Sequence, residues 1–449
     1  MKPRFIAWGC VAILMLSGSG AGLWLALAAK RGFTKIPEYS SSAEVWRQYF
    51  PLEYDSWQAT ADTDDEAHNP LADNPRLAVL RVGDADAPLA RRVYGHANAL
   101  ARFREFARDD TPAAELVFYS SDVPRLMHEL GAATFYQKNW RQLAPRVGNP
   151  VSCLDCHNPK TMRLAVTRPY LAEAYAAVTG RDIRNASKKK LRSLSCAQCH
   201  AQYYLDRDTV SGAVTVKLPW SKNGYSADAI ERYYDRIGHH DYIHAISKTP
   251  LLKARHPDFE LASSGAHARR GLSCADCHMP TLTVNGREFR DHQTRNPLQN
   301  MSTCLACHKE DGPTLEAMVE KQQQQIGELR GQAEDLLIRA HYEIRDATEH
   351  GASDEELATA RRLVRRAQWR WDFVSSSRGA AFHAPDEAAR ILSVALDQVK
   401  EARRQLSAIR RQHGRTQEVP IPADHPIPRQ NIGSKKALNH QDTKARSFI

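Results

Sequence analysis

The fold of this 449-residue chain is decided by the stretch Cys153-Leu154-Asp155-Cys156-His157. Two cysteines stand three positions apart, and a histidine follows the second one directly. The same Cys-x-x-Cys-His pattern occurs three more times, although composition predicts only about 0.007 chance occurrences in the whole chain. The further copies consist of Cys196, Cys199 and His200, of Cys274, Cys277 and His278, and of Cys304, Cys307 and His308.

This spacing has a mechanical reason. Two thiols three residues apart reach the two vinyl groups of one porphyrin, and the adjacent histidine then faces the iron. Zinc binding would leave the histidine after every pair unexplained, and disulfides inside such short loops would be strained. The sequence therefore predicts four covalently attached c-type haems, with His157, His200, His278 and His308 as proximal iron ligands.

A low-spin haem that transfers electrons needs a second axial ligand, commonly histidine or methionine. Four of the remaining histidines stand out by their neighbours and are candidates for distal iron ligands. They are His96, His244, His267 and His292.

The composition is that of an ordinary globular protein, with 42% hydrophobic and 25% charged residues. Its length suits one large domain or two to three smaller ones. The formal net charge is +10, but basic and aromatic residues are not interleaved as on a nucleic-acid surface. We therefore expect no nucleic-acid partner.

The N-terminus indicates export. Lys2 and Arg4 precede an uncharged run, Phe5–Ala29, which is long enough to span a bilayer. Residues 1–31 are thus either a membrane anchor or a long cleavable signal, with length favouring the anchor. We expect a periplasmic protein, anchored in the inner membrane or exported by a signal peptide. Cys10, the ninth cysteine, lies within this run and outside the haem motifs.

Three further segments follow along the chain. Residues 32–312 form the predicted multihaem domain, mainly α-helical with little β-structure. Residues 313–413 have apolar residues at helical intervals and predict long helices, with a capping box at Ser353 and Glu356. These helices either form an arm for dimerisation or fold onto the haem domain. Residues 414–449 predict an extended tail.

The surroundings of the motifs resemble the ammonia-forming cytochrome c nitrite reductases, which are pentahaem periplasmic enzymes. The resemblance extends from about residue 37 to residue 411. Its most specific stretches are Cys153–Pro159, Cys196–His200 with Tyr203 and Tyr204, His244–Ser247, Leu252–Glu260, His267–Gly271 and Phe382–Pro385. The resemblance implies that His96, His244, His267 and His292 are distal ligands of bis-histidine haems. It also implies that the C-terminal helices form a dimer interface.

One part of the family pattern is missing. The catalytic fifth haem of the family is attached by a Cys-x-x-Cys-Lys motif just before an Asp-Val-Pro-Arg-Leu stretch, which is Asp122–Leu126 here. The preceding residues 115–121 contain neither cysteine nor lysine, and Tyr119 stands at or near the lysine position. The sequence thus lacks the tether and the lysine ligand of the nitrite-binding haem.

Other family site residues are partly kept. Tyr203 and His256 match the active-site tyrosine and histidine, whereas Tyr94 replaces the active-site arginine, with Arg92 nearby. At the family's calcium site, Gln202 and Arg255 replace a glutamate and a glutamine, and Lys253 remains. Losing a carboxylate and gaining a cation makes calcium binding unlikely.

Two main functions follow from these expectations. The first is a tetrahaem electron carrier of the nitrite reductase family without its own nitrite-reducing haem. The second is an active nitrite or hydroxylamine reductase with a non-covalent or unusual fifth haem. A third is a regulatory or assembly subunit. The expected partners are a membrane or periplasmic electron donor, such as a quinol-oxidising cytochrome, and a second copy or an intact homologue in a dimer.

Overall fold

The computed structural model describes residues 36–61, 74–84 and 95–422. The predicted N-terminal anchor or signal, Cys10, Arg92, Tyr94 and most of the predicted tail lie outside these ranges. No helix within them is both long and apolar enough to cross a membrane.

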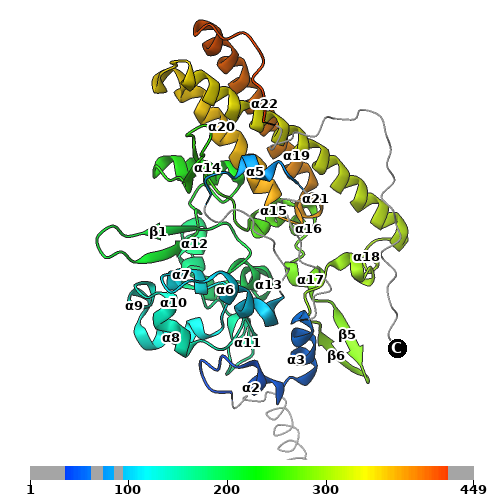
Figure 1. Cartoon of the computed structure of the whole chain (residues 1–449). Helices are drawn as coiled ribbons and strands as arrows, with labels where there is room; N and C mark the ends of the chain where they lie inside the picture. Colours follow the sequence, from blue (N-terminus) through cyan, green and yellow to red (C-terminus); the bar gives the residue numbers. More distant parts are fainter. Residues whose placement is uncertain (1–35, 62–73, 85–94, 423–449) are drawn as a thin grey trace, which may run out of the picture.

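The described chain is mainly helical with little β-structure, which confirms the predicted fold class. Short helices make up the described part of the first third, as Figure 1 shows in blue and cyan. They are α2 (Ala43–Arg47), α3 (Pro51–Gln58), η1 (Ala59–Ala61), α5 (Leu77–Leu80), η2 (His96–Asn98), α6 (Ala99–Phe106), α7 (Ala113–Leu116), α8 (Asp122–Leu130), α9 (Ala132–Tyr136), α10 (Trp140–Leu143) and η3 (Ala144–Arg146).

The middle third carries the haem motifs, again on short helices and the loops that follow them. Its helices are α11 (Cys153–Cys156), α12 (Pro169–Thr179), η4 (Ile183–Asn185), α13 (Lys188–Ala197), α14 (Ala227–Arg236), α15 (Asp258–Ser264), α16 (Ala266–Arg269), α17 (Cys274–His278), η5 (Pro297–Gln299) and α18 (Ser302–Leu305).

Within the described residues, three two-stranded antiparallel hairpins interrupt the helices. They pair β1 (Tyr204–Arg207) with β2 (Val214–Lys217), β3 (Tyr242–Ile243) with β4 (Pro250–Leu251), and β5 (Thr281–Val284) with β6 (Arg287–Arg290). Strand β2 alternates buried Val214 and Val216 with the partly exposed Thr215 and Lys217. The turn of the last hairpin is Asn285-Gly286, both with positive φ, as a tight two-residue hairpin requires.

Three long helices end the described chain: α19 (Gly312–Glu349), α20 (Asp354–Ser375) and α22 (Pro385–Gln412), with the short α21 (Ala380–His383) between the last two. Helix α20 begins at the predicted capping box, in which Ser353 and Glu356 each accept the other's backbone N–H. Apolar residues at helical spacing bury one face of each long helix in a shared core.

The long helices also pack on the haem-bearing body. A second core combines Trp369 and Phe373 of α20 with Ile230 and Tyr234 of α14. The indole nitrogen of Trp369 donates to the Ala227 carbonyl across this contact, at 3.0 Å. Figure 1 shows the three long helices lying side by side above the haem-bearing part. They are therefore continuous with the body that holds the haem motifs.

Candidate haem sites

The cysteines of the haem motifs lie at helix ends that their own neighbours fix in place. Ser152, which precedes Cys153, and Asp155, which lies between the two cysteines, form the capping box that starts α11. In the same way, Ser273 and Asp276 form the capping box that starts α17 around Cys274. These caps satisfy the first backbone N–H groups of each short helix, so the two thiols of a motif are presented on one turn.

The four motifs follow one another as neighbours in space. Cys156 lies near Cys199, and the Cys196 thiol is within hydrogen-bond reach of Cys274. Burial raises the pKa of the Cys277 thiol to about 11, and the nearby Cys304 thiol raises it further. The cysteines of successive motifs thus form a continuous series through the body.

Three motif histidines face a second histidine at the same separation. The ring centroids are 6.2 Å apart for His157 and His292, for His267 and His308, and for His278 and His383. Two imidazoles that bind one iron from opposite faces, each through a bond of about 2 Å, have ring centres about 6 Å apart. The three pairs therefore fit haem iron.

The hydrogen bonds of the Nδ1 atoms in three of these histidines also fit iron binding. His157 Nδ1 lies 3.0 Å from the Met162 carbonyl oxygen, and His278 Nδ1 lies 3.0 Å from that of Arg295. His292 Nδ1 lies 2.8 Å from its own partner, the Arg290 carbonyl oxygen. An Nδ1–H that donates to a backbone carbonyl fixes the tautomer in which Nε2 is free for a metal.

His96 lies near His200, the remaining motif histidine. Burial lowers the pKa of His96 to about 4, and the nearby His200 imidazole is the next cause. A buried neutral imidazole is the form that binds iron. Its position depends on Gly95, because a Cβ atom there would lie 2.0 Å from the Thr60 carbonyl oxygen.

The prediction that His244 is a distal ligand is wrong in this structure. Both of its ring nitrogens are used inside the protein: Nε2 contacts the Val79 carbonyl oxygen at 2.8 Å, and Nδ1 accepts from the backbone N–H of Ser247 at 3.3 Å. Its ring stacks on His341, with centroids 3.6 Å apart. His341 is itself occupied, since it contacts the Ser247 hydroxyl at 2.8 Å.

His383 stands in the place that the sequence assigned to His244. The sequence signal for this histidine is the stretch Phe382–Pro385, which resembles the family. The Nδ1 atom of His383 is buried and has no hydrogen-bond partner among the described residues. Gly379 and Gly265 leave room for it, because a Cβ atom on Gly379 would lie 2.4 Å from the His383 ring, and one on Gly265 would lie 1.8 Å from the His383 carbonyl oxygen.

Aromatic side chains fill the region before Asp122. Phe118 packs against Tyr203 with ring centroids 4.2 Å apart, and Tyr119 packs against Phe103 at 5.4 Å and Phe106 at 5.7 Å. All of them adjoin one hydrophobic core. The segment is thus held by ring packing.

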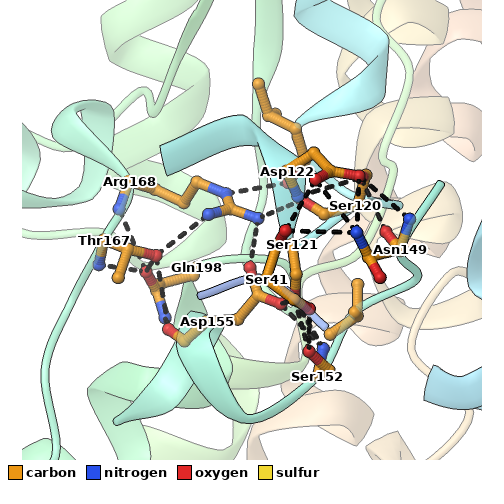
Figure 2. A network of polar contacts seen from close by, with 12 residues as sticks. Ser41, Ser120, Ser121, Asp122, Asn149, Ser152, Asp155, Thr167, Arg168 and Gln198 are labelled. Carbon is orange, nitrogen blue, oxygen red and sulfur yellow. Dashed lines mark hydrogen bonds and ion pairs between the residues drawn. The ribbon is translucent and has the colours of Figure 1, made fainter. Parts of the chain in front are cut away.

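A buried polar network fixes the backbone of this segment (Figure 2). The fully buried Arg168 guanidinium donates to the carbonyl oxygens of Val117 at 2.9 Å and Ser120 at 3.1 Å, and pairs with Asp155 at 2.6 Å. Asp155 also accepts from the Ser121 hydroxyl. The network therefore joins residues 117–121 to the first haem motif.

The same network reaches the second motif. Gln198, which lies between Cys196 and Cys199, accepts from the backbone N–H of Arg168 at 3.0 Å and donates to the Asp155 carbonyl oxygen at 2.9 Å. Figure 2 shows Gln198 and Arg168 side by side. Two haem motifs thus share one set of hydrogen bonds.

Comparison with known proteins agrees with this arrangement. The family model described as cytochrome c552 matches residues 42–449. The chain belongs to the cytochrome c552 family. It is 39% identical over 406 residues to a cytochrome c-552 from Porphyromonas gingivalis, covering 86% of this chain and 80% of the relative. It is 40% identical over 396 residues to one from Bacteroides fragilis, covering 84% and 79%.

A solved structure is also similar. The cytochrome c nitrite reductase catalytic subunit from Desulfovibrio desulfuricans matches with a TM-score of 0.76 and 25% identity, covering 84% of this chain and 88% of that one. The family resemblance read from the sequence is therefore confirmed, and membership of this cytochrome c family implies covalently bound haem c. The neighbour has two calcium sites, which counts against the sequence prediction that calcium does not bind.

In this chain, side chains that bind other protein groups occupy the positions of the family's calcium ligands. The Gln202 amide nitrogen donates to the Tyr203 carbonyl oxygen at 3.2 Å and to that of Lys253 at 3.0 Å. The Arg255 guanidinium pairs with Asp241 at 2.8 Å. Amide and guanidinium donors satisfy these oxygens, and one of the two family side-chain ligands has become a cation.

The two residues that match the family's active site, His256 and Tyr203, each contact charged neighbours. The Asp258 carboxylate is 2.7 Å from His256 Nδ1 and 3.6 Å from His200 Nδ1. The two histidines hold the pKa of Asp258 well below its ordinary value, although burial opposes this. The Arg255 guanidinium lies over the Tyr203 ring, 5.1 Å from its centroid.

Proposed function

We propose that this cytochrome c552 is a periplasmic tetrahaem electron carrier that lacks a nitrite-reducing haem of its own. The observation that carries the proposal is the pairing of every motif histidine with a second histidine. Haem, when bound, supplies a one-electron couple between ferric and ferrous iron. The chain's own residues then decide whether each iron is closed or open to a substrate.

The four histidine pairs would each hold one haem iron between their two imidazoles. His292, His308 and His383 each lie 6.2 Å from their partner rings, and His96 lies near His200. An iron held by two imidazoles has no free position for nitrite, yet it still accepts and donates an electron. The spatial series of motifs gives such electrons a continuous route through the protein.

The packing before Asp122 supports the same function. A catalytic haem would need a tether and an open space in this region. Here the ring of Phe118 packs on Tyr203, and Tyr119 packs on Phe103. The Arg168 guanidinium holds the backbone between them.

Calcium is not required in this proposal, in contrast to the two calcium sites of the Desulfovibrio desulfuricans protein. Calcium prefers six to eight oxygen ligands, whereas the Gln202 amide nitrogen already donates to the oxygens that line this position. Removing calcium with a chelator should leave the melting temperature unchanged. A melting temperature that falls on chelation and recovers when calcium is added would show that calcium binds.

A nitrite or hydroxylamine reductase is the second candidate. It is favoured by His256, which Asp258 orients at 2.7 Å and whose side chain is 43% exposed. An oriented and accessible histidine can deliver protons to a bound anion. This candidate would need a fifth haem held without cysteines.

The two candidates are separated by the number and spin state of the haems. We expect four covalent haems per chain by pyridine haemochrome assay, and only low-spin ferric signals by electron paramagnetic resonance. His256→Asn should leave the midpoint potentials unchanged. Five haems per chain, or a high-spin signal that changes with nitrite, would establish the reductase instead.

The partners follow from the carrier function. A membrane or periplasmic donor, such as a quinol-oxidising cytochrome, would supply electrons. The long helices α19 and α22 would join two copies, or this chain and an intact homologue. Cross-linking and mass measurement of the purified protein would identify the assembly, and a monomer at micromolar concentration would exclude a stable dimer.

A further inference from the structure

A cluster of exposed cations lies beside the haem motifs. We call it the basic cluster and define it as Lys188, Lys189, Lys190, Arg269 and Arg270, all of which are exposed. None of these five side chains forms an ion pair with a carboxylate among residues 36–61, 74–84 and 95–422. Five unneutralised charges therefore face solvent on one part of the surface.

The lysines stand where helix physics disfavours them. Helix α13 starts at Lys188 with Ser187 as its N-cap, so the three lysines occupy the first three helical positions. The N-terminus of a helix carries a partial positive charge and favours acidic residues. The first turn of α13 contains no acidic residue. Such local disagreement is typical of positions used for function.

The basic cluster is tied directly to the haem-binding helices. A Cβ atom on Gly271 would lie 2.4 Å from the Lys189 ammonium nitrogen, so Lys189 lies over the turn that follows Arg270. One helical turn further along α13, the Ser193 hydroxyl accepts from the backbone N–H of Cys274 at 3.1 Å. The cluster therefore lies against the start of α17.

Three haem sites meet at this surface. Helix α13 carries Cys196 at its other end, α17 carries Cys274, and α16 carries His267 next to Arg269 and Arg270. Figure 1 shows α13, α16 and α17 grouped at the centre of the molecule. A redox partner bound here would be near more than one haem.

We propose that the basic cluster is the docking surface for an acidic one-electron carrier protein. This inference rests on the proposed electron-transfer function. Complementary charge raises the rate of encounter and orients the partner before transfer. The transfer itself moves one electron from the reduced partner to a ferric haem of this chain, so the partner is oxidised and the iron becomes ferrous.

The surroundings favour a protein over an anionic membrane. Peripheral membrane binding combines basic residues with apolar side chains that enter the lipid. The exposed large apolar residues of the described chain are Tyr49, Val210, Ile237, Ile243, Val284, Leu305 and Met318. None belongs to residues 181–192 or 264–271.

The experiment measures electron transfer into the full haem-loaded protein by stopped flow. The probe is reduced plant-type ferredoxin as an acidic one-electron donor, with reduced methyl viologen as a small donor that needs no docking surface. The test variant is K188E/K189E/K190E. Glutamates suit a helix N-terminus, so this variant should fold at least as well as the wild type. The matched control, K222E/R362E/K400E, reverses three exposed charges elsewhere.

We expect the ferredoxin rate at low salt to fall about tenfold or more in the test variant and its salt dependence to weaken. The ferredoxin rate of the control variant should fall much less, and the rate with methyl viologen should not change in either variant. Equal losses in both variants, or no loss in the test variant, would refute the docking surface. If the test variant lost binding to anionic lipid vesicles without a change in the ferredoxin rate, the basic cluster would be a membrane-binding surface instead. Haems that viologen cannot reduce would instead refute the electron-transfer function.

Discussion

Replacement of His383 by alanine tests the ligand assignment that the structure changed. The His383 ring lies 6.2 Å from the His278 ring, whereas the Phe382 ring beside it offers no ligand atom. Removing the imidazole should therefore leave one iron with a single axial histidine. Since the chain has four motifs, about a quarter of the iron should change from low spin to high spin.

The midpoint potential of that haem should also move. Axial ligation tunes haem potentials over about 0.8 V, and loss of a neutral imidazole donor should raise this one by about 100 mV or more. Spin quantitation by electron paramagnetic resonance and a spectroscopic redox titration measure the two effects. The other three haems serve as the internal reference.

His244→Ala is the matched control for this prediction. The buried His244 ring contacts the Val79 carbonyl oxygen and the Ser247 backbone N–H, so its loss should cost about 2–4 kcal/mol of unfolding free energy. It should produce no high-spin iron. High-spin iron in His244→Ala, together with none in His383→Ala, would refute the assignment.

Three further predictions follow from the described contacts. Gly95→Ala should displace His96, the proposed distal ligand, and add high-spin iron, because the new Cβ atom would lie 2.0 Å from the Thr60 carbonyl oxygen. The control Gly148→Ala should add no high-spin iron, because no atom lies within 4 Å of its Cβ position. Equal spectra for the two variants would contradict this prediction. Arg168→Met should lower the unfolding free energy by about 3–5 kcal/mol in urea titrations, because Asp155 is left buried without its cation, and replacing both residues by apolar ones should recover part of the loss. Acid should destabilise the protein between pH 6.5 and pH 4, because burial lowers the pKa of His244 to about 4 and the unfolded chain binds the extra proton first. This group alone accounts for about 3 kcal/mol by pH 4, so His244→Gln should flatten the urea-measured pH profile, and an unchanged slope would argue against it.

The local parts of this fold could be read from the sequence. The Cys-x-x-Cys-His motifs fix where haem attaches, because both thiols and the proximal histidine lie within five residues. The long helices α19 to α22 could be predicted from apolar periodicity, and the start of α20 from its capping box. The hairpin at Asn285-Gly286 was missed, although this dipeptide is a strong turn signal.

The distal iron ligands could not be predicted from the sequence in the same way. His244 stands in a stretch that resembles the family as closely as the stretch around His383 does. Only the structure shows that Nε2 of His244 contacts a backbone carbonyl oxygen while Nδ1 of His383 lies buried without a hydrogen-bond partner among the described residues. A motif search does not register which ring nitrogen is free.

The sequence by itself determined the four Cys-x-x-Cys-His motifs, which predict haem attachment, and the absence of cysteine and lysine from residues 115–121. The tertiary structure decided which histidines face each other and what fills the space around Phe118 and Tyr203. The reason is physical: a covalent motif is a contact between near neighbours in the chain. The proposed ligand pair His278 and His383 joins residues about a hundred positions apart, and only packing brings their rings to face each other.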